Sequence, residues 1–349
     1  MTVVVKLGSS LVAGSGGRVK RSLLRARGRE IGRIVGGGEP ICVVSSGAIA
    51  LGLPRLGLAR RPRSIPQLQA ASALGQARLQ AAWDAALAPL PAAQVLLTAS
   101  DVGDRRTYVN ARIALEALLR LRAVPVVNEN DATATDEITF GDNDALAAQV
   151  AVLLRARLLV LLSDVEGVYS RAPGAPGAEL LAEGVHAGDA VLGEVSPLGR
   201  GGMRSKVLAA ELAAAAGIPT VIAGGTGASV LEPILAGEPR GTRFTAAERS
   251  EPAFKLWLRF GKPVSGRITV DEGARRAVLE DGASLLGVGT VCCEGTFEPG
   301  DAVELVGPDG VAFAKGIASI PAKELAAGTR GVEAVHRDRL VVYQAVVPR

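Results

Sequence analysis

The sequence predicts an α/β protein with an open, mainly parallel sheet sandwiched by helices, followed by a small C-terminal β-barrel domain. In the N-terminal part, short apolar, β-branched runs alternate with longer Ala/Leu/Arg stretches of helical spacing. Beyond residue 263, short alternating segments are separated by Gly, Pro-Gly and Pro-Asp-Gly turns. A chain of 349 residues is long enough for two domains that need no disulfide or metal for stability.

Each of the first five predicted strands of the N-terminal part is followed by a helix that returns the chain. We expect the strands at residues 3–5, 41–44, 94–97, 124–127, 158–162 and 220–223. We expect the helices at residues 19–35, 66–88, 106–122, 142–155 and 203–216. This alternation favours right-handed crossovers and a largely parallel sheet that is covered on both faces.

Two segments interrupt this pattern. Residues 165–200 are rich in Gly, Pro and Ala, which is typical of a lid or binding loop. Residues 246–263 are predicted to link an N-terminal domain, residues 1–245, to the barrel domain, residues 264–349, which carries one helix near residues 271–280.

The composition excludes several classes of protein. Hydrophobic content of 48% and charged content of 21% are typical of globular chains. The apolar stretch before Lys6 is only three residues long, which is too short for a signal peptide or a membrane span, so we expect a cytoplasmic protein with no membrane contact.

Histidine and cysteine usage argues against nucleophilic catalysis and structural zinc. Only two histidines occur, and there is no G-x-S-x-G motif. The three cysteines, Cys42, Cys292 and Cys293, lack the spacing of a disulfide framework or a zinc site, and we expect them to be buried thiols within strands.

Lysine is rare in this chain, with seven among 39 basic residues. Lys6 ends the first apolar run in VVVKLGSS, where Gly8 leaves room for a phosphate to approach the backbone. Lys206 lies in LGRGGMRSK, just after a glycine-rich turn that leads into a helix. Because lysine acts as a compact point charge toward phosphate oxygens, both are candidates for an ATP site. The alternatives are that these lysines are ordinary solvated charges and that the glycine-rich turn before Lys206 is merely a flexible hinge.

Two further motifs follow predicted strands. In VVSSGAIALG, Ser46 and Gly47 open a predicted helix and could hold a carboxylate or a phosphate, or form a plain N-cap. In LLVLLSDVEGVYS, Ser163 and Asp164 stand at the carboxyl end of an apolar strand, where nucleotides commonly bind, although such a pair also forms simple turns.

The segment NENDATATDEITFGDND, residues 128–144, places six carboxylates after the fourth predicted strand. We expect these acids to hold something cationic, such as an ammonium group, a metal ion or a catalytic lysine. With the lysines and glycine turns they describe an ATP site beside a pocket for a second substrate. Phosphoryl transfer needs mainly alignment and charge stabilisation, so no protein nucleophile is required.

These motifs, in this order and spanning almost the whole chain, resemble those of the amino acid kinase family, and within it the branch that phosphorylates glutamate. The blocks are VVVKLGSS, VVSSGAIALG, VVNENDATATDEITFGDNDALA, LLSDVEGVY, GGMRSK and a C-terminal ITVDEGA…VHRD. The C-terminal domain resembles a PUA domain.

The resemblance implies ATP-dependent, magnesium-dependent phosphorylation of the L-glutamate γ-carboxylate to γ-glutamyl 5-phosphate, the first step of proline biosynthesis. It also implies feedback inhibition by proline and a homo-oligomer, either a dimer or a tetramer. It assigns no metal ligand.

The resemblance also assigns residues by position. Lys6, Lys206 and Asp144 would be catalytic, with Asp144 orienting the lysines and Lys206 stabilising charge on the moving phosphoryl group. Glutamate would contact Ser46, Asp131 and Asn143, with Asp131 and its neighbours holding the α-ammonium. ATP would contact Lys6, Ser163, Asp164, Arg200, Gly201, Gly202, Met203, Arg204, Ser205 and Lys206. Arg200 departs from the threonine usual in the family before Gly-Gly-Met, which bears on the fine contacts of the ATP loop.

Two alternatives stay open. The chain could be another kinase of this fold, acting on aspartate or acetylglutamate, or an RNA-binding protein that acts through its PUA-like domain. Residues 262–349 contain ten basic and twelve acidic residues, so this domain offers no basic surface for nucleic acid.

Overall fold

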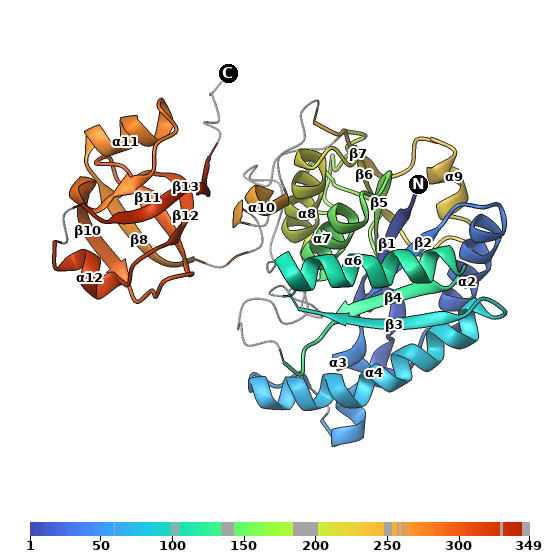
Figure 1. Cartoon of the computed structure of the whole chain (residues 1–349). Coiled ribbons are helices and arrows are strands. Elements are labelled where there is room, and N and C mark those ends of the chain that lie inside the picture. Colours follow the sequence, from blue (N-terminus) through green and yellow to red (C-terminus); the bar gives the residue numbers. More distant parts are fainter. Residues whose placement is uncertain are drawn as a thin grey trace. The chain divides into compact units, whose positions relative to one another are not determined.

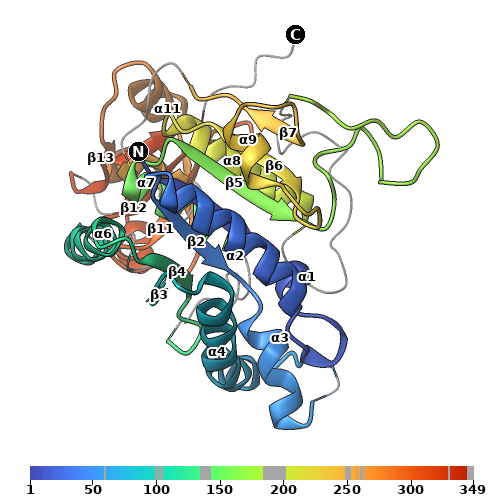
Figure 2. The same ribbon diagram turned by 90° about the vertical axis from the view of Figure 1, so that its right-hand side faces the viewer.

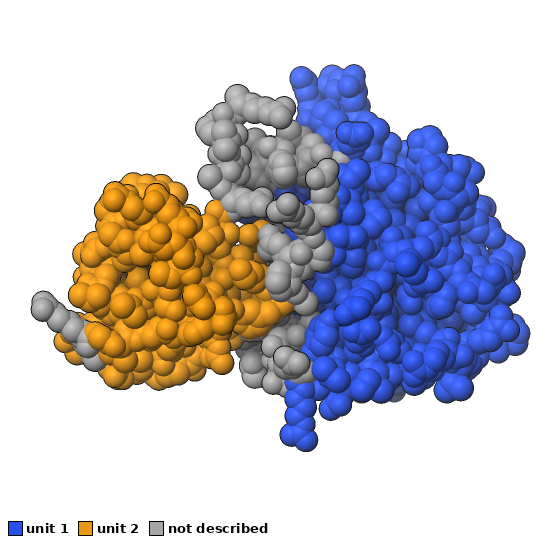
Figure 3. All heavy atoms as spheres, turned by 45° about the horizontal axis from the view of Figure 1, so that its top comes forward, with its two compact units in different colours: residues 1–251 blue, residues 252–349 orange. Residues whose placement is uncertain are grey.

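The chain forms two compact units, Met1–Glu251 and Pro252–Arg349, coloured separately in Figure 3. The computed structural model describes residues 1–58, 60–98, 101, 105–133, 143–183, 202–247, 253–256, 258–259, 262, 264–328 and 331–343. The division lies inside the segment expected to be a linker, and the exact domain boundaries stay a prediction. Among the described helices, none is both long enough and apolar enough to cross a membrane.

The first unit is built on a seven-stranded sheet with the order β3-β4-β2-β1-β5-β6-β7 (Figure 1). The first six strands run parallel, as predicted, and β7 pairs antiparallel with β6 at one edge. The strands are β1 (Val3–Leu7), β2 (Ile41–Ser45), β3 (Ala92–Leu97), β4 (Val124–Glu129), β5 (Leu158–Ser163), β6 (Thr220–Gly224) and β7 (Thr242–Phe244). The predicted α/β class is therefore confirmed, and only the three-residue β7 has no counterpart in the sequence pattern.

Helices cover both faces of this sheet (Figures 1 and 2). The contacts place α2, α4 and α9 on one face and α6, α7 and α8 on the other. The helices are α1 (Ser9–Val12), α2 (Arg21–Gly36), α3 (Ala48–Gly52), α4 (Ile65–Leu87), α6 (Arg105–Arg120), α7 (Asn143–Leu154), α8 (Met203–Ala215) and α9 (Leu231–Leu235).

Strand β1 determines which way Lys6 points. Val3, Val5 and Leu7 belong to the core that α2 and α4 cover. Because successive side chains of a strand point to opposite faces, Lys6 faces the layer of α7 and α8. A charged side chain in a fully buried central strand needs a partner, and these two helices supply it.

Helix α3 packs against α4 with almost no space between the two backbones. A Cβ atom on Gly75 would lie 1.8 Å from the carbonyl oxygen of Ala48, and one on Gly52 would lie 1.8 Å from that of Ala71. Only glycine allows this approach. The packing matters for the site described below, because α3 begins directly after Ser46 and Gly47.

We predict that Gly75→Ala destabilises the first unit by about 3 kcal/mol, since the added methyl group would force the two backbones apart. Gly32→Ala on α2 is the matched control, because nothing lies within 4 Å of the added Cβ. There, alanine should stabilise the helix by about 0.5–1 kcal/mol. Urea unfolding of both variants measures the difference, and equal stabilities would contradict this account of the α3–α4 contact.

The second unit is a curled six-stranded sheet with the order β10-β8-β11-β12-β13-β9 around its own apolar core. Its strands are β8 (Val264–Val270), β9 (Leu285–Leu286), β10 (Thr290–Gly295), β11 (Ala302–Val306), β12 (Ala312–Ala318) and β13 (Glu333–Val342), and its helices are α10 (Ala253–Leu256), α11 (Glu272–Leu279) and α12 (Ala322–Ala326). Asp271 caps α11 by accepting a hydrogen bond from the Ala274 amide at 2.7 Å.

Two details of the second unit differ from simple expectations. Leu258, in the segment expected to be a linker, is fully buried and packs with Ala302 and Val341 of the sheet. All three cysteines lie in strands, but only Cys42 is buried, while Cys292 is exposed. The expectation of a buried thiol was wrong for Cys292, because its neighbour Cys293, which is half-buried, packs against the core and successive side chains of a strand point to opposite faces.

Candidate active site

Three charged side chains from three separate elements meet at the carboxyl end of the parallel sheet. Lys6 comes from the end of β1, Asp144 from the first turn of α7, and Lys206 from the first turns of α8. The Lys206 ammonium donates to Asp144 Oδ2 at 2.9 Å, and the Lys6 ammonium donates to Asp144 Oδ1. Exposed side-chain fractions are 5% for Lys6, 8% for Lys206 and 0% for Asp144.

The electrostatics keep this carboxylate ionised. Burial by itself would raise the pKa of Asp144, but the charges of Lys6 and Lys206 and their hydrogen bonds outweigh it and hold the pKa far below its ordinary value. Two ammonium groups around one carboxylate leave a net positive charge in a buried place. Such a place favours a polyanion, because the low local dielectric strengthens each charge interaction.

Glycine turns and polar groups surround this cluster. The amide of Gly8, after β1, donates to the Leu162 carbonyl at 3.3 Å, which joins the ends of β1 and β5. Gly202 is the N-cap of α8 and offers no side-chain cap, so amides of the first turn stay available to an anion. Ser205 Oγ lies 2.9 Å from Asp144 Oδ2 and 2.9 Å from the Gly202 carbonyl, and its single proton serves one of them at a time.

The structure describes some, but not all, of the other residues predicted to contact ATP. Ser163 is buried at the end of β5, and its hydroxyl lies 3.1 Å from Asp164 Oδ1, while Asp164 is exposed. At the start of α8, Met203 is half-buried and Arg204 is exposed. Arg200 and Gly201 lie outside the described residues, as do positions 134–142 of the acidic segment.

The second half of the site is a chain of buried amides. Asn143 Nδ2 lies 3.1 Å from the Ser45 carbonyl oxygen and 2.7 Å from Asn128 Oδ1, and Asn128 Nδ2 lies 2.7 Å from Gln76 Oε1. The Ser45 carbonyl can only accept, so it orients all three amides. Asn143 Oδ1 and Gln76 Nε2 have no hydrogen-bond partner among the residues that the structure describes.

Asp131 adds a carboxylate to this half of the site. Ser72 Oγ donates to Asp131 Oδ2 at 2.5 Å, whereas the buried Asp131 Oδ1 has no hydrogen-bond partner within the described part of the chain. Burial raises the pKa of Asp131 above its ordinary value, although the Ser72 hydrogen bond and the charge of Arg61 oppose the rise. Buried oxygens without partners cost free energy, which a cationic ligand would recover.

Helix α7 joins the two halves of the site. Its first residue, Asn143, belongs to the amide chain, and its second, Asp144, binds the two lysines. Ser46 is buried beside them, and its amide donates to the Leu7 carbonyl at 3.1 Å. Gly47 then takes a φ of 111°, a left-handed conformation that glycine adopts without strain, and α3 begins.

The sequence analysis missed the contribution of α4 to this site. Ser72, Gln76 and Trp83 all reach the polar cluster from this helix, and Trp83 Nε1 donates to Ser45 Oγ at 2.9 Å. A possible signal was the pair of polar residues four apart on the inner face of an otherwise Ala/Leu-rich helix. Asn128, at the start of the acidic segment, was also not singled out.

Comparison with known proteins shows which family this chain belongs to. The sequence model of the amino acid kinase family matches residues 1–224, and that of the PUA domain matches residues 266–338. The chain belongs to the amino acid kinase family. This kinase is therefore a phosphotransferase, as the resemblance implied, and its C-terminal domain is a PUA domain.

Curated relatives of this amino acid kinase match over nearly its full length. Glutamate 5-kinase of Thermus thermophilus is 44% identical, over 97% of this chain and 96% of its own. Glutamate 5-kinase of Acinetobacter baumannii is 41% identical, over 98% and 96%. Among solved structures, isopentenyl phosphate kinase covers 70% of this chain and 100% of its own, with a TM-score of 0.49 and 22% identity.

Proposed function

We propose that this kinase transfers the γ-phosphoryl group of ATP to the γ-carboxylate of L-glutamate and so forms γ-glutamyl 5-phosphate. The relatives named glutamate 5-kinase support the choice of acceptor. The observation that carries it is a pair of buried oxygens, Asp131 Oδ1 and Asn143 Oδ1, that have no hydrogen-bond partner among the described residues, together with the Lys6–Asp144–Lys206 cluster next to Asn143.

The two halves of the site suit the two substrates. Asp131 Oδ1 and Asn143 Oδ1 are acceptors, which an α-ammonium group requires, and Gln76 Nε2 is a donor for a carboxylate oxygen. Lys6 and Lys206 lie where they neutralise phosphate oxygens. Asn143 and Asp144 are consecutive, so the acceptor and the polyphosphate are held next to each other.

In the reaction, a γ-carboxylate oxygen of glutamate attacks the γ-phosphorus of ATP. The new O–P bond forms as the bond from the γ-phosphorus to the bridging oxygen breaks, and ADP leaves with that electron pair. The acceptor is already ionised near neutral pH, so the protein needs no general base. Lys206 and Lys6 stabilise the charge that develops on the transferred group and on the leaving oxygen.

Magnesium enters this proposal as part of the nucleotide substrate. Among the residues that the structure describes, no group of three or more His, Cys, Asp or Glu side chains could hold a metal ion. Mg²⁺ commonly binds through substrate phosphates, water and one or two carboxylates, and the exposed Asp164 fits the carboxylate role.

A coupled assay tests the choice of acceptor. With ATP, Mg²⁺ and hydroxylamine, glutamate should yield the γ-hydroxamate. Product with aspartate or acetylglutamate, and none with glutamate, would reject the assignment.

Proline added to the same assay should lower the rate, since we also propose feedback inhibition. Size-exclusion chromatography with light scattering tests the proposed dimer or tetramer.

We predict that Asp131→Asn raises the KM for glutamate about ten- to hundred-fold and changes kcat little, because one charge-assisted contact to the ammonium is lost. Steady-state kinetics with varied glutamate measures this. Asp84→Asn, an exposed site on α4, is the matched control and should behave as the wild type.

The proposed role of Asp131 also predicts how kcat/KM for glutamate depends on pH. Asp131 must be ionised to hold the ammonium, so kcat/KM for glutamate should fall as pH falls through its pKa in the free enzyme. Because that pKa is raised, the fall should begin at a higher pH than for an ordinary aspartate. The substrate titrates in the same way in the wild type and in Asp131→Asn. The difference between the pH profiles of the two enzymes therefore reports the titration of Asp131 alone. Profiles of the same shape would remove Asp131 from the site.

A further inference from the structure

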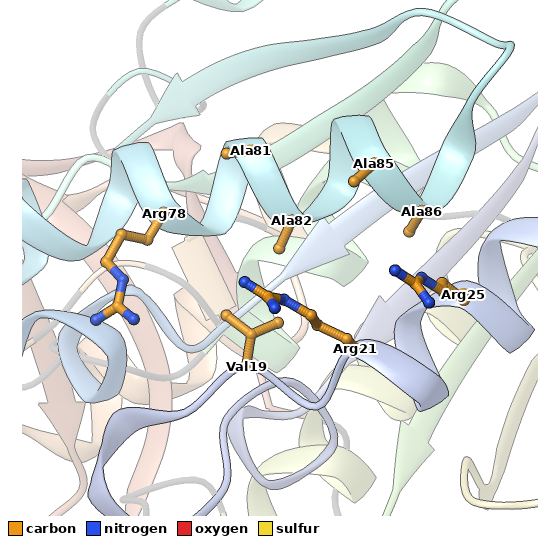
Figure 4. Close-up of a pocket in the computed structure, with 8 residues that line it drawn as sticks. All are labelled: Val19, Arg21, Arg25, Arg78, Ala81, Ala82, Ala85 and Ala86. Carbon is orange, nitrogen blue, oxygen red and sulfur yellow. The ribbon is translucent and has the colours of Figure 1, made fainter.

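A hollow lies between α2 and α4 that the candidate active site does not use. Its volume is about 360 Å³. Figure 4 shows the residues that line it: Val19, Arg21, Arg25, Arg78, Ala81, Ala82, Ala85 and Ala86. Neither Lys6 nor Lys206 is among them, so any ligand here would be additional to the proposed substrates.

The packing of the two helices explains why the hollow exists. At Gly28 the helices are in direct contact, since a Cβ there would lie 2.0 Å from the Ala86 carbonyl oxygen. Arg21 is seven residues before Gly28, about 10 Å along the helix axis. On α4, the hollow is lined by Arg78 and four alanines, Ala81, Ala82, Ala85 and Ala86, and the alanines are too short to fill it. These alanines form an apolar floor (Figure 4).

The charge around the hollow is positive and largely unbalanced. Arg21 and Arg25 are four residues apart on α2, a spacing at which like charges repel. Neither forms an ion pair with any carboxylate in the described part of the chain. The guanidinium of Arg78 donates to the Leu51 carbonyl at 2.8 Å, which orients it without neutralising it.

Acidic groups on the same helices are engaged elsewhere. Glu30 is fully buried, pairs with Arg27 and accepts from the amides of Val230 and Leu231 at 2.6 and 3.0 Å. Asp84 lies 3.4 Å from Gln80 Nε2, on a different flank of α4 from the alanines. The first turn of α2 contains no acidic residue, so the positive end of its dipole adds to the three guanidinium charges.

We propose that this hollow binds a small phosphate-bearing anion. Guanidinium groups match phosphate oxygens through paired hydrogen bonds, and a multiply charged phosphate relieves the repulsion among the three arginines better than a single carboxylate does. The alanine floor and Val19 provide contact for a small apolar part of the ligand. This binding does not depend on which acceptor the kinase phosphorylates.

Isothermal titration with inorganic pyrophosphate tests the proposal. A non-hydrolysable ATP analogue and Mg²⁺ are kept saturating and constant, so that the proposed ATP site is filled. The wild-type enzyme should bind one equivalent of pyrophosphate. The double variant Arg21→Gln/Arg25→Gln should bind at least about ten-fold more weakly, and Ala82→Glu, which places a carboxylate on the floor, should abolish binding.

Arg29→Gln is the matched control, because Arg29 is exposed on the same helix but does not line the hollow. It should bind as the wild type does, and thermal melts should show all variants folded. No binding to the wild type, or an affinity of the double variant within two-fold of it, would overturn the proposal. Tighter binding of citrate than of pyrophosphate would overturn the assignment to phosphate.

Discussion

Replacing Lys206 by alanine is expected to lower kcat by about a thousand-fold and to leave the KM for glutamate within about three-fold of the wild-type value. The Lys206 ammonium is buried and donates to Asp144 at 2.9 Å, and Lys206 is not one of the residues that we assign to glutamate. Its interaction with the phosphoryl group strengthens as charge develops in the transition state. Removing it therefore raises the barrier to chemistry more than it weakens acceptor binding.

The hydroxamate assay at saturating ATP and varied glutamate measures both constants. Lys20→Ala is the control, because Lys20 is exposed and precedes α2. Lys206→Arg retains the charge but not the compact geometry, so its kcat should fall between those of the wild type and Lys206→Ala. A kcat for Lys206→Ala equal to that of the wild type would show that the catalytic lysine has been misassigned.

Replacing Asp144 by asparagine is expected to destabilise the first unit by about 3–5 kcal/mol, because it leaves two buried ammonium groups without their counter-charge. The side chain of Asp144 is fully buried and bonds both lysines. Activity should be lost as well, since the lysines lose the group that orients them. Urea unfolding monitored by circular dichroism measures the change.

The nucleotide provides a sharper test of this variant. If the phosphates of ATP supply the missing negative charge, then MgATP should raise the Tm of Asp144→Asn more than it raises the Tm of the wild type. Asp84→Asn, at an exposed position, should respond to MgATP as the wild type does. An equal or smaller response of Asp144→Asn would contradict the placement of the phosphates beside the lysines.

The pH dependence of stability follows from the same cluster. The pKa of Asp144 is lower in the folded protein than its ordinary value of 3.8. Its contribution to stability is therefore complete above the ordinary value and is lost only as pH falls below it. The stability difference between the wild type and Asp144→Asn should stay constant from pH 8 to about pH 5 and shrink in stronger acid.

Much of the fold could be predicted because the information is local. The spacing of apolar residues marked all six parallel strands and the five long helices of the first unit, and turn residues marked the second. The three-residue β7 carries too short a pattern to detect, and the exposure of Cys292 depends on which face of β10 packs against the core. The motifs also marked Lys6, Asp144 and Lys206, although the pairing of Asp144 with both lysines came from the family resemblance.

What the sequence determined by itself was the order of strands and helices and the residue types at the ends of the strands. Tertiary structure alone decided that Lys6 and Lys206 share the carboxylate of Asp144, although they stand 138 and 62 positions from it. It also left Asp131 Oδ1 without a hydrogen-bond partner in the described ranges and opened an arginine-lined hollow beside α4. The physical reason is that the burial and hydrogen bonding of a side chain depend on which elements pack together. The spacing of apolar residues along the sequence does not show that packing.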